Sequence, residues 1–503
     1  MGRARTTGRV RSARKAPALN LHQAAFGLLE QRPEASAATP LSPPAAIIAG
    51  PILFLAGAVL TAPLAALICA MAGLAAYVLL VSALRLGAAM TPLRWSARRP
   101  LSTTDLPAVT VIVALYGEAK VVPGLAASLS RLDYPRDRLQ ILFALEAGDR
   151  DTVAAARSVS RRSRVETVVL EPCGPQTKPR ALNYALQAAR GDLIAVYDAE
   201  DAPHPRQLRA AAEAFAADDR LAVVQAPLNW YNHQQSWLTR QFALEYAAQF
   251  NALLPLFVRL GLPLPLGGTS NVFRRDRLEA AGGWDPFNVT EDADLGFRLA
   301  RHGWSAGVIA PGTGEEAPLT VKAWTGQRSR WLKGHLVSWL VQMRDPAGLV
   351  QAAGWRALAG LQLTLLANVL SAGLHGPGLA LLGLSAILAG IGGDSSPALT
   401  GALLGAAAYL CAMACAATGA ARAGLSARLT ELLTMPVYWL LQAPALVRAL
   451  RETATAPYLW VKTRHGVSTA RREVPHDIAG DDQPDDRSRR PVRAGGLAVR
   501  QAG

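Results

Sequence analysis

A long uncharged stretch near the amino terminus constrains the fold of this chain more than any other feature of its sequence. No Asp, Glu, Lys or Arg occurs from Ala35 to Leu84. A membrane-spanning helix needs roughly 20 apolar residues, so the apolar part, from Ala45 to Leu84, is long enough for two helices with a break near Thr61–Pro63. A signal peptide would have a shorter apolar region closer to the first residue. We therefore predict a transmembrane hairpin over residues 45–90.

The residues before this hairpin are basic. The first sixteen include Arg3, Arg5, Arg9, Arg11, Arg14 and Lys15. The whole chain has 52 Lys and Arg against 37 Asp and Glu, a formal net charge of +15, which suits nucleic acid, anionic lipid or an anionic substrate. A basic segment beside a membrane span stays on the cytoplasmic side and attracts anionic lipid. We predict that residues 1–44 are such a segment, with a nucleic-acid arm as the alternative, and we expect no nucleic-acid partner.

Apolar residues return in the last third of the chain. We predict a transmembrane cluster over residues 355–450, in which Ser395–Ala421 is an uninterrupted span. Either Ala357–Gly393 crosses once with a re-entrant piece, or the shorter Leu432–Val447 lies along the interface. Residues 451–503 are basic and rich in Pro, Gly and Asp, and we expect a largely disordered cytoplasmic tail. These features predict a multi-pass protein of a bacterial-type plasma (inner) membrane, with the domain between the apolar regions in the cytoplasm.

The middle of the chain has the pattern of an α/β domain. After a linker over residues 91–107, short β-rich runs alternate with helical stretches across residues 108–345, which predicts a mostly parallel sheet covered by helices. The expected strands are Val109–Tyr116, Leu139–Glu146, Val165–Glu171, Asp192–Glu200 and Leu221–Pro227. Ligands of such sheets bind beyond the carboxyl ends of the strands. With four cysteines and no zinc spacing, we expect a reducing compartment and neither a disulfide scaffold nor a zinc site.

Carboxylates follow the apolar strand that ends at Tyr197. Asp198, Glu200 and Asp201 come directly after it. Mg²⁺ prefers one or two carboxylates together with substrate phosphate oxygens, and a metal there would neutralise charge on a departing diphosphate. The alternative is a solvated acidic turn before Pro203.

A second acidic group is formed by Glu291 and Asp292, which lie just before the helical stretch 293–302. A carboxylate here can act as general base for an acceptor hydroxyl. The alternative is structural: Thr290 caps the helix and the acids complement its dipole.

An aromatic and basic group follows at Gln327, Arg330 and Trp331. The Trp ring offers a flat apolar face for a sugar, while Arg and Gln donate hydrogen bonds to phosphate and hydroxyl oxygens. An ordinary aromatic and basic belt at a membrane interface is the alternative. The next stretch, Leu332–Met343, reads as an interfacial helix leading into the membrane.

Three further positions can reach the same edge of the sheet. Lys178 opens a predicted helix, where a diphosphate binds favourably. Glu118 follows the first strand. Glu146 and Asp149 lie at and just after the end of the second strand.

Together, these elements resemble the D, D, D, Q-x-x-R-W pattern of processive, cellulose-synthase-like glycosyltransferases of family 2. That family has the nucleotide-sugar-binding, Rossmann-like α/β fold called GT-A and inverts the configuration at the anomeric carbon. The resemblance covers roughly residues 108–345 and implies that Asp292 is the catalytic base. It also implies nucleotide-sugar-binding roles for Glu118, Glu146, Asp149, Lys178, Asp198, Gln327, Arg330 and Trp331, and Mg²⁺ or Mn²⁺ binding by Asp198 and Glu200.

The sequence departs from the family pattern at two positions. The family usually has Asp where this chain has Glu146, so Asp149 is an alternative for that role. It also more often has Asp where this chain has Glu200.

The resemblance implies transfer of a sugar from a nucleotide sugar, with UDP as the expected nucleotide, to a growing exopolysaccharide or β-glucan. An enzyme that adds a single sugar to a lipid-linked acceptor is the alternative, and a non-enzymatic transporter or scaffold with a degenerate transferase domain is the third reading. Expected partners are the donor, a glycan or lipid-linked acceptor and the bilayer, with export or accessory subunits left open.

Overall fold

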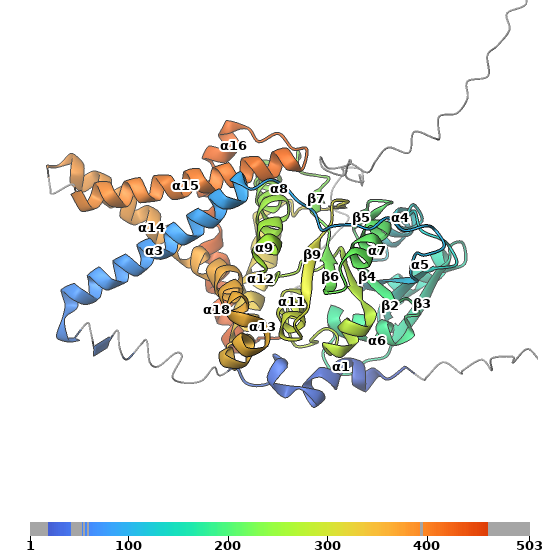
Figure 1. Cartoon of the computed structure of the whole chain (residues 1–503). Coiled ribbons are helices and arrows are strands. Elements are labelled where there is room, and N and C mark those ends of the chain that lie inside the picture. Colours follow the sequence, from blue (N-terminus) through green and yellow to red (C-terminus); the bar gives the residue numbers. More distant parts are fainter. Residues whose placement is uncertain (1–18, 42–52, 54–55, 58–59, 393–395, 461–503) are drawn as a thin grey trace, which may run out of the picture.

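A seven-stranded sheet forms the centre of the computed structural model, which describes residues 19–41, 53, 56–57, 60–392 and 396–460 (Figure 1). Its strands are β1 (Val109–Leu115), β2 (Leu139–Glu146), β3 (Val165–Leu170), β4 (Leu193–Tyr197), β6 (Leu221–Gln225), β8 (Asn271–Arg274) and β9 (Ser305–Val308). Their order across the sheet is β3-β2-β1-β4-β8-β6-β9. A smaller sheet has the order β5-β10-β7, with β5 at Ala202–Pro203, β7 at Leu228–Trp230 and β10 at Thr313–Glu315.

The large sheet is mostly parallel, as predicted, and β8 is the one reversed strand among its seven. β1 runs parallel to β2 and β4, so that Val109 pairs with both Leu139 and Leu193. β8 runs antiparallel to both β4 and β6. The chain enters β8 through Ser270, the only described residue other than glycine with positive φ (59°), whose N–H donates to Val196 O at 2.8 Å. This tight entry places a reversed strand in the middle of the sheet.

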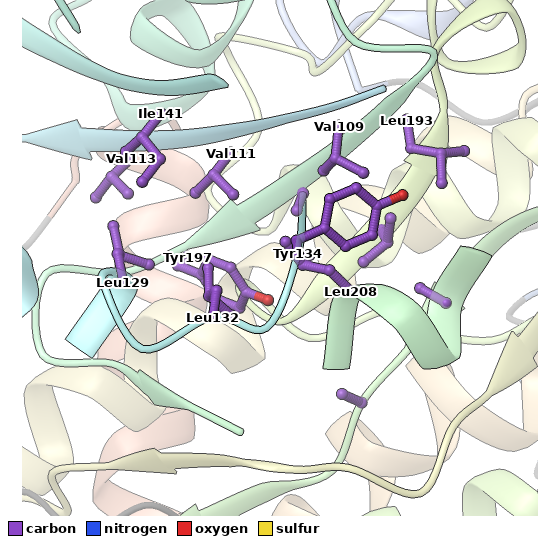
Figure 2. Close-up of a cluster of buried hydrophobic side chains, with 14 of the residues drawn as sticks. Val109, Val111, Val113, Leu129, Leu132, Tyr134, Ile141, Leu193, Tyr197 and Leu208 are labelled. Carbon is purple, nitrogen blue, oxygen red and sulfur yellow. The ribbon is translucent and has the colours of Figure 1, made fainter. Parts of the chain in front are cut away.

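Both faces of the sheet are buried, as expected for strands covered by helices. On one face, Val109, Val111 and Val113 of β1 pack with Leu129 and Leu208 (Figure 2). That face is covered by α4 (Val122–Leu129), α5 (Arg150–Ser160) and α7 (Gln207–Ala217). The other is covered by α6 (Lys178–Ala188), α9 (Leu254–Leu260), α10 (Arg275–Ala280) and α11 (Glu291–Arg301). The result is a three-layer α/β domain.

Long apolar helices extend from one side of this domain (Figure 1). They are α3 (Pro63–Met90), α13 (Pro346–Leu361), α14 (Ala367–Gly390) and α15 (Ser396–Arg422). A π-helix, η3 (Gln362–Leu366), joins α13 to α14. Three segments of the described chain are long and apolar enough to cross a membrane, namely Met71–Met90, Pro346–Ala380 and Leu399–Arg422. The predicted apolar helices before and after the domain are therefore present.

Shorter helices connect the domain to the apolar ones. α8 (Trp237–Ala248) and the π-helix η2 (Gln249–Leu253) pack against α15, and α12 (Val321–Gln342) packs against α18 (Gln442–Thr455). The predicted interfacial helix is thus the second half of a longer helix. The predicted segment Leu432–Val447 is broken into α16 (Leu429–Leu433), α17 (Met435–Leu440) and the start of α18. None of the span candidates among the described residues includes it.

Part of the predicted amino-terminal segment belongs to the domain. Helix α1 (Leu21–Gln31) packs on α6, and the Asn183 side chain donates to Ala24 O at 3.2 Å. A short 3-10 helix, η1 (Pro33–Ala35), follows it. The basic residues 1–18, most of the first half of the predicted hairpin and the tail 461–503 lie outside the described residues.

Candidate active site

The predicted site residues gather around one cavity of about 490 Å³ beyond the carboxyl ends of β1, β2 and β4. All of them except Asp149 line it. The lining members are Glu118, Glu146, Lys178, Asp198, Glu200, Asp292, Gln327, Arg330 and Trp331. Residues far apart in the chain therefore meet at the edge of the sheet where ligands of α/β folds bind.

The acidic turn after β4 is stabilised by its own last residue. Asp201 is buried and accepts hydrogen bonds from the Asp198 N–H at 2.7 Å and from the Thr269 hydroxyl. Burial raises the pKa of the Asp201 carboxyl, and the charges of Asp198 and Glu200 raise it further. The buried Glu315 of β10 faces the same group, and burial together with Asp201 and Glu200 raises its pKa. This surplus of buried carboxylates attracts a cation.

Lys178 provides one such cation. It is the first residue of α6, and Pro179 occupies the next position, where a missing N–H is tolerated. Its ammonium contacts Asp198 Oδ1 and donates to Gly268 O at 2.7 Å. Burial lowers the pKa of Lys178, but the charges of Asp198 and Glu291 outweigh this effect, so that its pKa lies above the ordinary value. Lys178 is therefore charged when the cavity is empty of ligand.

Glu291 and Asp292 begin α11 on the other side of Lys178. Asp292 Oδ1 accepts the N–H of Ala293 at 2.8 Å. Burial raises the pKa of Asp292, whereas this N–H, Lys178 and Arg330 lower it. Burial raises the pKa of the neighbouring Glu291 to about 8, and the charge of Asp292 adds to the rise. Burial therefore makes both carboxyls hold a proton more readily than exposed acids do.

Thr290 occupies the N-cap position of α11, but its side chain makes no capping hydrogen bond. Its N–H donates to Asn288 Oδ1 at 3.0 Å, and its hydroxyl lies 3.5 Å from that of Ser338 on α12. The predicted capping role is therefore wrong, because the threonine side chain is turned towards α12.

One turn of α12 carries the aromatic and basic group. Arg330 donates to Val289 O at 3.2 Å, and its guanidinium lies 4.6 Å from the centroid of the Trp460 ring, which also lines the cavity. The Trp331 ring stacks on Phe242, with centroids 6.0 Å apart and planes at 15°. These contacts hold the arginine and the indole at the cavity wall.

Glu146 and Asp149 have separate roles in the structure. The buried Glu146 accepts two hydrogen bonds from Arg180, one of them at 2.6 Å. Asp149 caps α5 by accepting the N–H of Thr152 at 3.2 Å, and it also accepts the N–H of Gly117. Asp149 does not line the cavity, so it orients the loop after β1 from behind.

Comparison with known proteins shows the family of the region that contains this cavity. Residues 107–334 match the model of "Glycosyltransferase like family 2". This region is a glycosyltransferase family 2 domain. Its mixed sheet with helices on both faces is the predicted GT-A-like α/β fold.

Relatives of the family 2 domain are named for different products. A beta-monoglucosyldiacylglycerol synthase from Synechocystis is 29% identical over 51% of this chain and 53% of the relative. A cellulose synthase catalytic subunit from Komagataeibacter xylinus is 26% identical over 47% of this chain and 32% of the relative. The matched region spans about half the length of the first relative and about a third of the length of the second. A solved mannosyltransferase from Pyrobaculum calidifontis, in complex with GDP-Man and Mn²⁺, is 20% identical with a TM-score of 0.45, covering 76% of this chain and 99% of that one.

The family 2 domain has a donor set that fits a hard divalent cation. No group of three or more His, Cys, Asp or Glu side chains within the described ranges is arranged to hold a metal. Mg²⁺ needs only one or two carboxylates when substrate phosphates complete its shell, and Asp198 and Glu200 provide two at the cavity wall. Asp201 Oδ1 and Glu315 Oε1 are buried and have no hydrogen-bond partner among the described residues. Carboxyl oxygens are the ligands that a hard divalent cation prefers, so these unpaired oxygens suit a cation bound beside them.

Sequence reasoning missed two residues of this site. Glu315 lines the cavity without belonging to a recognised motif. Gly268 was also missed. A Cβ at this position would lie 3.3 Å from Asp292 Oδ2 and 3.8 Å from Lys178 Nζ, so a side chain here would crowd the Asp292 carboxylate. The adjacent glycines at 267 and 268 were the available signal for a close approach of the backbone.

Proposed function

We propose that this chain is an inverting glycosyltransferase that transfers a sugar from a nucleotide-sugar donor, with UDP as the expected nucleotide, to an acceptor hydroxyl at a membrane. One observation carries this proposal. Asp198, Asp292 and Trp331 come from three distant parts of the chain and line a single cavity. A sugar diphosphate needs this combination of acid, base and aromatic face.

The chain's own side chains account for the chemistry. Asp292 takes the proton of the acceptor hydroxyl, and the hydroxyl oxygen attacks the anomeric carbon from the face opposite the nucleotide. The bond between that carbon and the diphosphate oxygen breaks, and the nucleotide diphosphate leaves with the electron pair. Lys178 and Arg330 hold the negative charge of the leaving group, an electrostatic effect that is usually the largest catalytic contribution.

The remaining groups position the donor. Glu118 and Glu146 lie at the strand ends where the base and ribose bind, and Arg180 fixes Glu146. Mg²⁺ or Mn²⁺ held by Asp198 and Glu200 would neutralise charge on the diphosphate. Gln327 and the Trp331 ring face the acceptor sugar.

We place the family 2 domain in the cytoplasm, because Arg422 ends the third candidate span, Arg428 follows it, and basic residues favour that side. The donor would then come from the cytoplasm and the acceptor from the bilayer. Two acceptor classes fit this arrangement, a growing polysaccharide and a lipid-linked sugar.

The test is a transfer assay with the purified full-length chain in lipid. A panel of nucleotide sugars is supplied with Mg²⁺ or Mn²⁺, and the product is sized. We expect transfer from one donor, lost when the metal is chelated. Long products indicate a polysaccharide synthase, and one added sugar indicates the lipid-linked alternative. Absence of transfer and of donor hydrolysis across the panel would support a non-enzymatic transporter or scaffold instead.

A further inference from the structure

The cavity extends from the strand-end acids to the apolar helices. Its wall there includes Arg85 of α3, Thr364 of η3, and Asn368 and Ser371 of α14. These residues lie in two of the candidate membrane spans, Met71–Met90 and Pro346–Ala380. An acceptor held in the bilayer would therefore enter the cavity at this membrane end.

Arg85 is the only charged residue of the span Met71–Met90. Its guanidinium lies 5.6 Å from the centroid of the Trp439 ring. It forms no hydrogen bond or ion pair with any residue in the described part of the chain. A charged side chain in a membrane span is costly, and such residues typically mark functional sites.

A structural role for Arg85 is already filled by another residue. Arg422 donates to the carbonyl oxygens of Ala88 at 3.2 Å, Ala89 at 3.4 Å and Thr91, and so caps the carboxyl end of α3. The α3 terminus therefore does not need the Arg85 guanidinium.

The acid that acts on Arg85, Glu245, already has hydrogen-bond partners of its own. Glu245 acts on Arg85 electrostatically, but its two oxygens accept hydrogen bonds from Arg328 at 2.8 and 2.6 Å. One of these oxygens also accepts from the Tyr438 hydroxyl at 2.7 Å. The charge of Arg85 is thus left for a ligand.

A second donor faces the same end of the cavity. Burial lowers the pKa of His335 to about 4, and the charge of Arg328 acts in the same direction, so the ring is neutral at physiological pH. The amide nitrogen of Asn368 lies 2.8 Å from His335 Nδ1. An amide nitrogen can only donate, so Nδ1 accepts and the ring proton is on Nε2. His335 therefore has an N–H donor at Nε2, and the residue lines the cavity.

Two π-helices border this end. Gln249 and Phe250 of η2 and Leu363 and Thr364 of η3 line the cavity. π-helical turns are rare and occur frequently at functional sites. Two such turns therefore line the same cavity as Arg85.

We propose that Arg85, together with the Nε2–H of His335, binds the phosphate group of a lipid-linked acceptor. A full positive charge without a contacting carboxylate selects an anion over the neutral hydroxyls of a glycan. The surrounding membrane spans favour a phosphate attached to a lipid. This inference rests on the proposed glycosyltransferase function and assigns the acceptor to the lipid-linked class. Arg85 positions the acceptor, and the proton transfer stays with Asp292.

The test measures binding rather than turnover. The full-length chain in dodecyl maltoside is titrated by microscale thermophoresis with farnesyl phosphate, farnesol and inorganic phosphate. We expect farnesyl phosphate to bind about tenfold or more tightly than either of the others, since a charge-assisted hydrogen bond contributes about this much. Equal binding of farnesol would overturn the proposal, and equal binding of inorganic phosphate would overturn its lipid part.

Variants locate the effect. Arg85→Gln should lose about tenfold in affinity for farnesyl phosphate and keep its affinity for farnesol. Arg85→Lys should retain part of the preference, and Arg259→Gln, at an exposed arginine of α9, should behave as wild type. Unchanged farnesyl phosphate binding by Arg85→Gln contradicts the assignment.

The same samples are titrated with UDP and Mg²⁺. UDP binding by Arg85→Gln shows that the variant is folded. If the wild type binds UDP but shows no preference for the lipid phosphate, the acceptor inference alone fails. If it binds no nucleotide, the failure lies with the proposed function.

Discussion

The two ends of the cavity balance their charges in different ways. At the strand ends, Lys178 contacts Asp198 and is influenced by Glu291 and Asp292, so cation and acids form one group. At the membrane end, Arg85 lies over Trp439 and contacts no acid among the described residues. The first arrangement suits a diphosphate and its metal, because the diphosphate can pair with Lys178 while the metal pairs with the acids. The second suits the uptake of an anion that the protein itself does not supply.

The largest expected effect is at the strand-end acids. Asp292→Asn keeps the shape of the side chain but cannot accept a proton, so transfer should fall by about 10²–10⁴-fold. Donor binding should persist, because Lys178 and Asp198 are intact. Turnover is measured by product formation and donor affinity by calorimetry. Asp276→Asn, an exposed acid in the first turn of α10, is the matched control. Turnover of Asp292→Asn close to the wild-type rate would remove this residue from its role.

Asp198→Asn should separate the two ends of the cavity. Loss of this carboxylate leaves Lys178 without its ion-pair partner and removes a proposed metal ligand, so Mg²⁺-dependent UDP affinity should fall by about tenfold to a hundredfold. Farnesyl phosphate binding at the membrane end should stay within about twofold. Both affinities are measured on the same preparation. If Asp198→Asn lowers the affinity for both UDP and farnesyl phosphate, the two ends of the cavity are coupled and do not balance their charges separately.

Gly268→Ala should have an intermediate effect. The new Cβ would lie 3.3 Å from Asp292 Oδ2, so the carboxylate must shift, and kcat should fall by about tenfold because catalysis is sensitive to such displacement. Gly148→Ala is the control, since its Cβ would meet nothing within 4 Å. An unchanged kcat would show that space beside Asp292 is not limiting.

The smallest effect concerns stability and pH. The Glu291 carboxyl has a pKa of about 8 in the fold against an ordinary value of 4.5, because burial and Asp292 disfavour its charge. Below pH 4.5 it is protonated in both states. As the pH rises towards 8, only the unfolded state ionises fully, so the native state loses stability. Glu291→Gln removes this loss, and its melting temperature relative to wild type should rise across that window. A difference that does not vary with pH would contradict the assigned pKa.

Local patterns were sufficient to find most of the strands. β2 has the predicted bounds, and β1, β3, β4 and β6 lie within the predicted runs, because buried strands are continuous apolar runs in the sequence. The four-residue strands β8 and β9 were missed. Their sequences, Asn271–Arg274 and Ser305–Val308, contain polar residues or glycine, and only their neighbours in the sheet make them strands.

The site shows the same division. The acids after Tyr197 could be identified because they follow a predicted strand at the edge where ligands bind. The acids at the start of α11 and the Trp331 group could be identified from their residue types and spacing. The separate roles of Glu146 and Asp149 could not, since Arg180 and Gly117 become their partners only in the fold.

By itself, the sequence determined the α/β pattern, the presence of apolar helices on both sides of it and which motifs lie at the cavity, because each depends on neighbouring residues. Only the tertiary structure decided that β8 runs backwards through the sheet and that Arg85 joins the far end of the same cavity. The direction of β8 depends on a short connection, and the position of Arg85 depends on contacts between segments hundreds of residues apart. Neither leaves a periodic signal in the sequence.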